Sequence, residues 1–208
     1  MACNFRAAMP RSLIPLALAL ACSAALAEKA DRLKPFVFSS DKTGLVDAVN
    51  QRTELLGNVI ITKGSLLLKA EKVDVRETRD GYHQAFASGL AGQPVSFRQA
   101  RDLPGEAIDG VADQVEYDTR TETVRFIGNA TVRRLRGTAV AEEVTGAVIV
   151  YDSRSEVFTL EGGSASPNPN GRTRIVMMPR TPPAEDAAPA APPLPLKPST
   201  TLQPGKPS

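Results

Sequence analysis

The sequence contains no tryptophan, one histidine and two cysteines, and these scarcities rule out several kinds of functional site. A histidine-based metal cluster is excluded because His83 is alone, and a Ser-His-Asp triad is disfavoured for the same reason. Both cysteines, Cys3 and Cys22, lie near the N-terminus, so the rest of the chain has no thiol for a metal or a nucleophile. Three tyrosines and no tryptophan also disfavour the stacked aromatic platforms that bind sugars or single-stranded nucleic acid.

A long apolar run is missing as well. The N-terminal region instead has the three-part layout of a cleaved export signal. Arg6 and Arg11 form its basic start, an apolar stretch covers 13–25, and small residues follow. The stretch is shorter than the roughly 20 residues of a membrane-spanning helix. We therefore expect a signal peptide over 1–27, with cleavage after Ala27.

A lipoprotein is the alternative interpretation of this region, with Cys22 as the acylated residue. Ala19-Leu20-Ala21 lacks the larger aliphatic residue expected three positions before such a cysteine, which favours cleavage after Ala27. Either way, the sequence after residue 22 contains no cysteine, so the fold has no internal disulfide and its core must hold it unaided.

Charge is almost balanced, with 25 basic and 23 acidic residues in the whole chain. Two of the basic residues, Arg6 and Arg11, fall in the predicted signal peptide, which leaves 23 of each sign in the mature chain. Proteins that bind nucleic acid usually carry a basic field. We therefore expect no nucleic-acid partner.

Proline is concentrated at the C-terminus, where residues 179–208 alternate it with alanine, threonine and serine. Such a segment cannot bury enough apolar surface to offset the entropy lost on ordering. We expect a disordered Pro-rich tail over 179–208. The remaining residues, 28–178, have a length typical of one domain.

Within that domain, apolar residues recur in pairs two positions apart, which is the period of a β-strand with one buried and one solvated face. Glycine-containing turn signals separate the pairs, among them Gly57-Asn58, Asp80-Gly81 and Gly128-Asn129. No helical stripe accompanies them, so the predicted fold class is all-β. The pairs are Val59 and Ile61, Leu66 and Leu68, Val73 and Val75, Val95 and Phe97, and Val124 and Phe126.

The β-region is internally repetitive. Residues 117–122 (YDTRTE) return at 151–156 as YDSRSE, and a second offset of seventy-one residues maps Gly57-Asn58 onto Gly128-Asn129. Repeated β-units of this size bury their apolar faces by stacking on their neighbours. The sequence therefore predicts a stack of similar hairpins.

Carboxylates are the remaining groups that could perform catalysis. Asp118 and Asp152 stand where turns begin, and we expect each to accept hydrogen bonds from backbone amides two residues on. Glu71 and Glu142 recur as equivalent repeat positions, which favours solvated strand ends over a glycosidase pair. His83 is expected at a strand start after a turn. We predict no enzyme, no metal and no cofactor.

Four segments, in this order and at these spacings, resemble the repeats of the LptA/OstA-like lipopolysaccharide transport proteins. The resemblance covers about residues 36–165, and the ordered set carries it rather than any single segment. The segments are 56–64 (LGNVIITKG), 68–73 (LKAEKV), 92–99 (GQPVSFRQ) and 112–118 (ADQVEYD).

The resemblance implies an open antiparallel β-jellyroll of stacked repeats. Members of the family shield the lipid A acyl chains of lipopolysaccharide in a groove while the sugars stay in water. They bridge the periplasm between an inner-membrane transporter, through an LptC-type protein, and an outer-membrane translocon of the LptD type. We therefore expect a periplasmic lipopolysaccharide carrier that contributes to outer membrane assembly.

Alternation assigns eleven residues to the inward, groove-lining face, and two apolar strands to the ends of the jellyroll. Exposed edge strands pair readily with another chain, so we expect a head-to-tail homo-oligomer or strand addition to the partner jellyrolls. The groove candidates are Val59, Ile61, Leu66, Leu68, Val73, Val75, Val95, Phe97, Val124, Phe126 and Val132. The edge candidates are Phe36, Val37, Phe38, Ile175, Val176 and Met177.

Two other functions remain open at this stage. A structural, filament-forming β-protein would have a closed and filled core. A carbohydrate-active jellyroll enzyme would need two carboxylates that converge in a cleft. Alternating apolar strands fit an open groove and a filled core equally well.

Overall fold

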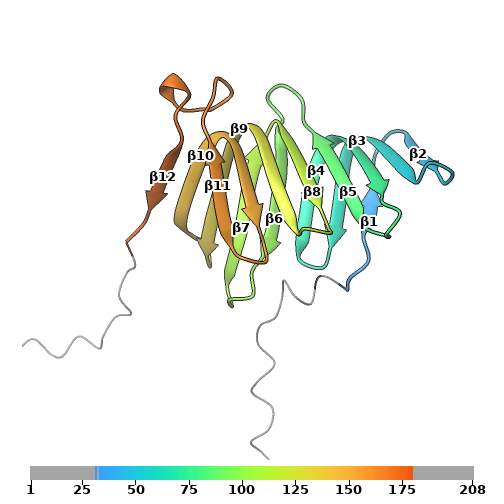
Figure 1. Ribbon diagram of the computed structural model, residues 1–208, viewed down its shortest axis with the longest axis horizontal. Helices are drawn as coiled ribbons and strands as arrows, with labels where there is room; N and C mark the ends of the chain where they lie inside the picture. The colour runs from blue at the N-terminus through green and yellow to red at the C-terminus, as the bar shows by residue number, and fades with distance from the viewer. Residues whose placement is uncertain (1–30, 32, 180–208) are drawn as a thin grey trace, which may run out of the picture. The chain divides into compact units, whose positions relative to one another are not determined.

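Twelve β-strands and one short 3-10 helix, η1, make up the regular secondary structure between residues 33 and 178 (Figure 1). The computed structural model describes Asp31 and residues 33–179. The predicted signal peptide and all but the first residue of the predicted Pro-rich tail lie outside this range. In chain order the elements are β1 (Val37–Ser39), β2 (Gly44–Asp47), β3 (Arg52–Lys63), β4 (Leu66–Glu77), β5 (His83–Ser88), β6 (Val95–Ala100), β7 (Glu106–Ala112), β8 (Gln114–Asp118), β9 (Thr123–Arg136), β10 (Ala139–Asp152), β11 (Val157–Glu161), η1 (Pro169–Gly171) and β12 (Arg174–Met177).

The strands form one antiparallel sheet that folds over into two layers, because the long strands β3, β4, β9 and β10 each run through both. Layer I contains β2, β5, β8 and β11 with one half of each long strand. Layer II contains β1, β6, β7 and β12 with the other halves. The predicted all-β jellyroll class is confirmed.

Two glycine-asparagine pairs bend the long strands. Gly57-Asn58 in β3 has φ values of 81° and 43°, and Gly128-Asn129 in β9 has 77° and 46°. The pairing register of β3 with β4 and of β9 with β10 shifts at these points, as in a β-bulge. The asparagine side-chain amide of each pair donates to Asp41 or Asp113, at 3.0 and 2.8 Å. The expectation of turns here was wrong. β3 stays paired with β4 on both sides of Gly57-Asn58, and β9 stays paired with β10 on both sides of Gly128-Asn129.

The hairpin turns after β2, β8 and β10 in layer I each begin with an aspartate that caps them, as predicted for two of these positions. Asp118 accepts from the backbone amides two and three residues on, at 2.8 and 3.2 Å, and Asp152 does so at the same distances. Asp47 caps the turn after β2 in the same way. The strand β5 starts at His83, directly after a turn, which confirms that expectation too.

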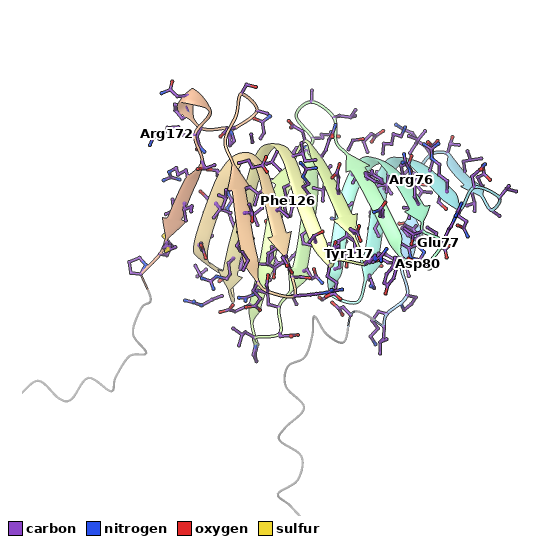
Figure 2. All side chains as sticks on the ribbon, viewed as in Figure 1. Arg76, Glu77, Asp80, Tyr117, Phe126 and Arg172 are labelled. Carbon is purple, nitrogen blue, oxygen red and sulfur yellow. The ribbon has the colours of Figure 1, made fainter. Side chains whose placement is uncertain are left out.

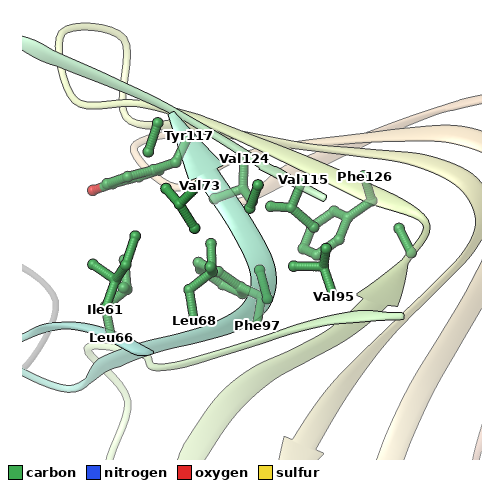
Figure 3. Packing of buried hydrophobic residues seen from close by; sticks show 14 of the residues in the cluster. Ile61, Leu66, Leu68, Val73, Val95, Phe97, Val115, Tyr117, Val124 and Phe126 are labelled. Carbon is green, nitrogen blue, oxygen red and sulfur yellow. The ribbon is translucent and has the colours of Figure 1, made fainter. Parts of the chain in front are cut away.

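The core lies between the layers and consists of cross-strand rows (Figure 3). Phe126 pairs in register with Val115 on one side and with Ile149 on the other, and none of these three side chains is exposed. Fully burying an aliphatic or aromatic side chain of this kind contributes about 1.5–3 kcal/mol to folding. Gly110 in layer II accommodates the ring of Phe126, because a Cβ there would lie 2.4 Å from it.

Candidate functional site

All eleven residues predicted to line the groove lie between the layers, and each is 5% exposed or less. They come from β3, β4, β6 and β9 and belong to one apolar cluster. Contact of these residues with lipid stays a prediction. They are Val59, Ile61, Leu66, Leu68, Val73, Val75, Val95, Phe97, Val124, Phe126 and Val132.

The two layers are joined along one long margin and separate along the other. The bends of the long strands form the joined margin. Along the opposite margin, which we call the seam, the turns after β4, β8 and β10 of layer I face the turns after β3, β6 and β9 of layer II. No strand pairing crosses the seam within the part of the chain that the structure describes. The interior can therefore be reached from this side without breaking a β-ladder.

A cleft of about 470 Å³ opens on the seam. Its walls combine aromatic side chains with basic and hydroxyl groups, which suits a ligand with apolar and polar parts. Asp31 lies at its margin and accepts a hydrogen bond from the Ser65 amide at 2.9 Å, which ties the N-terminal segment to the β3–β4 turn. The lining side chains include Lys34, Phe36, Lys63, His83, Tyr117 and Arg154.

Phe36 closes one part of this cleft by touching both layers. Its ring stacks on Phe38 of layer II at 5.7 Å between centroids, and it meets His83 and Tyr117 of layer I at 5.7 and 6.3 Å. The ammonium of Lys63 lies 4.9 Å from the same ring, a cation–π contact. Figure 2 shows Tyr117 on its strand close to the seam. Phe36, predicted as an edge residue, is also a contact between the layers.

A second cavity, of about 280 Å³, lies where β11 and β12 end the two layers. One wall is apolar and one is ionic. Arg101, only 5% exposed, pairs with Glu106 and with Glu156 of the β10–β11 turn. Burial is the largest single influence and opposes the charge of Arg101, but the hydrogen bond to Glu156, together with the negative charges around the guanidinium, raises its pKa.

Sequence reasoning missed this ionic wall. Arg134 is two residues after the inward-facing Val132 in β9, so it lies on the same face of the strand. It pairs with Glu142 at 2.9 Å. The side chain of Glu142 is 17% exposed, so the expectation of a solvated strand end was wrong there. Its repeat equivalent, Glu71, pairs instead with Lys42 at 2.8 Å. The position of Arg134 in the alternating pattern of β9 could have indicated that it faces inward, but an ionisable residue is ordinarily assigned to the solvated face.

Among the described residues β1 pairs only with β3 and β12 only with β10, so both predicted end strands are edges. Val37, Ile175 and Met177 are more than half exposed, and Phe36, Phe38 and Val176 are partly buried. Two further edges were not predicted. β2 and β11 end layer I in the same way, and they expose Val46 and Val157. Each end of the described jellyroll therefore presents two strands that have one unpaired edge each.

The described residues contain no group of three or more metal-ligating side chains placed to hold an ion. They also contain no helix long and apolar enough to cross a membrane.

Residues 39–157 match the protein family described as "LptA/(LptD N-terminal domain) LPS transport protein". The chain belongs to this family. It is 30% identical over 158 residues to the lipopolysaccharide export system protein LptA of Haemophilus influenzae. The matched region covers 76% of this chain and 84% of that protein. It is also 29% identical over 140 residues to LptA of Escherichia coli K12, covering 66% of this chain and 72% of that protein.

The fold of LptH, described as the LptA-homologous periplasmic component of the lipopolysaccharide transport device of Pseudomonas aeruginosa, is similar to that of this chain. The TM-score is 0.61 at 22% identity, and the match covers 72% of this chain and 99% of that structure. These matches confirm the family resemblance. The LptA family consists of transport proteins rather than enzymes, which confirms the expectation of a non-enzymatic protein.

Proposed function

We propose that this LptA-family chain binds lipopolysaccharide through the acyl chains of lipid A and carries it across the periplasm, from an LptC-type partner at the inner membrane to an LptD-type partner at the outer membrane. Family membership supports this, because the curated relatives are lipopolysaccharide export proteins and LptH is described as periplasmic.

The observation that carries the proposal is an apolar interior whose two walls are not joined at the seam. The inward faces of both layers supply aliphatic and phenyl groups. The cleft on the seam leads toward them and has basic groups at its margin, among them Lys63 and Arg154. Acyl chains can therefore enter the jellyroll while the sugars and phosphates stay in water.

The interior is packed, so lipid uptake requires the layers to move apart at the seam. Each CH₂ removed from water contributes about 0.8 kcal/mol, so ten of them contribute about 8 kcal/mol toward opening and binding. The bulges at Gly57-Asn58 and Gly128-Asn129 lie on the joined margin, where such a movement would pivot. Apolar contact is non-directional, which lets a bound lipid slide along the walls.

The edge strands support the bridge part of the proposal. Within the described residues, β1 and β2 each leave one edge unpaired at one end of the jellyroll, and β11 and β12 do so at the other. Strand addition between the C-terminal end of one jellyroll and the N-terminal end of the next would align their interiors. Copies of this chain, or the jellyrolls of its membrane partners, can supply the next unit.

A filament-forming structural protein is the second candidate, and the packed core is the observation that favours it. Native mass spectrometry of the protein purified from a Gram-negative periplasm separates the two. Bound lipopolysaccharide, recognised by its mass and by loss of fatty acids on fragmentation, is the result expected for a carrier. Protein that is free of lipid under the same conditions, even after incubation with lipopolysaccharide, would contradict the carrier and favour the filament.

A further inference from the structure

The cavity at the C-terminal end of the jellyroll carries donors that its own residues leave unused. Arg101 and Arg134 both line it, and the Nε of each is buried with no hydrogen-bond acceptor among the described residues. The side chain of Arg101 is 4% exposed, so water does not replace the missing acceptor easily. A buried donor without an acceptor is unfavourable, and a ligand oxygen would relieve this.

The opposite wall of the same cavity is apolar. Phe158 stacks on Tyr151 with centroids 4.8 Å apart, and Leu160 and Ile175 line the same cavity. Ile175 is 53% exposed, so this wall is open to a ligand from outside. A molecule that fits must combine an oxygen-rich anionic group with a hydrocarbon chain.

We propose that this cavity binds the phosphate group of a phosphorylated acyl lipid, with the phosphate on Arg101 and Arg134 and a chain along Phe158, Leu160 and Ile175. The inference rests on the proposed function, since it places one part of the transported lipid. Arginine suits this role because its planar guanidinium donates two parallel hydrogen bonds to a phosphate.

Glu156 occupies part of this site. Its carboxylate pairs with Arg101, its side chain is 41% exposed, and it lies in the β10–β11 turn. Glu142 balances Arg134 in the same way from within β10. These two carboxylates balance the charges of Arg101 and Arg134, and the phosphate takes the place of the more exposed one, Glu156, on Arg101.

The test measures binding of bis-phosphorylated lipid A and of chemically dephosphorylated lipid A to the full-length mature protein and three variants. Arg134→Gln should weaken binding of the phosphorylated form about tenfold, the loss expected for a hydrogen bond to a charged group. Glu156→Gln should tighten it, because the competing carboxylate is gone. Arg133→Gln is the matched control, since Arg133 pairs with Glu143 on the outer face of the same strand.

Binding of the dephosphorylated form should be the same for all four proteins. Equal binding of the phosphorylated form by wild type, Arg134→Gln and Glu156→Gln would overturn the phosphate site and leave the carrier function intact. If wild type binds neither form, the carrier function itself fails. Inorganic phosphate alone should compete poorly, and complete displacement of lipid A by it would contradict the acyl part of the site.

The two variants also protect the test against loss of fold. Arg134 is in a partly buried ion pair, so its replacement can lower stability, which a melting curve will report. Glu156 is on the surface, so its variant should melt like wild type and still change lipid affinity. A tightening at Glu156→Gln supports the proposal on its own, and an unchanged or weaker affinity there counts against it.

Discussion

The ring of Phe97 in β6 meets the ring of Phe126 in β9 edge to face, with centroids 5.6 Å apart and planes at 83°. Phe97 belongs to layer II, and this part of β9 belongs to layer I, so the pair joins the two layers in the middle of the core (Figure 3). An acyl chain that enters the interior at this depth must separate the two rings. The same contact therefore stabilises the closed jellyroll and sets part of the cost of opening it.

Truncation of this contact should be strongly destabilising. Phe126→Ala removes a ring that is 0% exposed, and we expect the free energy of unfolding to fall by about 3–5 kcal/mol. Urea denaturation followed by circular dichroism measures it. Arg125→Ala, one residue earlier on the outer face, is the control and should change stability by about 0.5 kcal/mol or less. Similar losses for both variants would show that the layers are not packed as described.

The bulge in β9 should be sensitive to crowding as well as to backbone conformation. Gly128 has φ 77°, and a Cβ there would lie 2.5 Å from the carboxylate of Asp113. Gly92 has a similar φ of 78° but open space around it. Gly92→Ala should cost about 1–2 kcal/mol from the left-handed conformation alone, and Gly128→Ala should cost more. Equal melting temperatures for the two variants would contradict a tight bend at Gly128.

The turn aspartates should make stability depend on pH in the acidic range. Hydrogen bonds from Ser155 and Arg154 hold the pKa of Asp152 below its usual 3.8. A carboxyl whose pKa is lower in the folded than in the unfolded state stabilises the fold above the unfolded pKa, and loses this as the pH falls through the folded one. The stability difference between wild type and Asp152→Asn should therefore be larger at pH 6 than in strong acid. A difference that stays constant over this range would contradict the assignment.

Burial opposes ionisation of the second turn aspartate, Asp118. Its hydrogen bond from Gln84 at 2.8 Å, together with the turn amides, still lowers its pKa. Asp118→Asn should show the same pH dependence as Asp152→Asn. Gln84→Leu removes the neighbouring donor. In this background the loss of stability caused by Asp118→Asn at neutral pH should be smaller than in wild type. An unchanged loss would show that Gln84 does not contribute.

Assembly should depend on the outer face of β12. Val176 lies opposite Glu143 on that face, so an aspartate there would repel its own sheet, whereas Val176→Lys is compatible with it. Val176→Lys should weaken self-association, and association with both membrane partners, by about tenfold or more while the melting temperature stays close to that of wild type. Gln114→Lys, on the outer face of the doubly paired strand β8, is the control. Analytical ultracentrifugation and pull-downs give the readout, and unchanged association of Val176→Lys would contradict edge pairing.

Period-two alternation located the core rows correctly because one face of each strand is buried and a slip by one residue would reverse every side chain. It failed at Gly57-Asn58, since positive φ permits both a turn and a bulge and only the partner strand decides between them. It also placed no charge inside the jellyroll. Arg101 and Arg134 lie there because glutamates from other strands neutralise them, and such pairing across the fold leaves no local pattern.

The edges show the same limit. β1 and β12 were predictable from their apolar composition. β2 shows no alternation of buried and exposed residues, and β11 alternates without any sign in its sequence that one of its edges stays unpaired. Their position at the ends of layer I depends on how far the long strands extend on the other side of the bend. Those lengths cannot be obtained from the sequence until the positions of the bulges are known.

Site-specific photo-crosslinking tests the central claim most directly. A photoreactive amino acid is placed in turn at Phe97, Phe126, Arg98 and Arg125 in cells that produce lipopolysaccharide, and adducts are detected with an antibody to lipopolysaccharide. The first two positions are inward and buried, and the last two are on the outer faces, with side chains 51% and 47% exposed. A carrier that holds lipid A between its layers predicts adducts at Phe97 and Phe126 and none at Arg98 or Arg125. Adducts confined to Arg98 and Arg125 would contradict it.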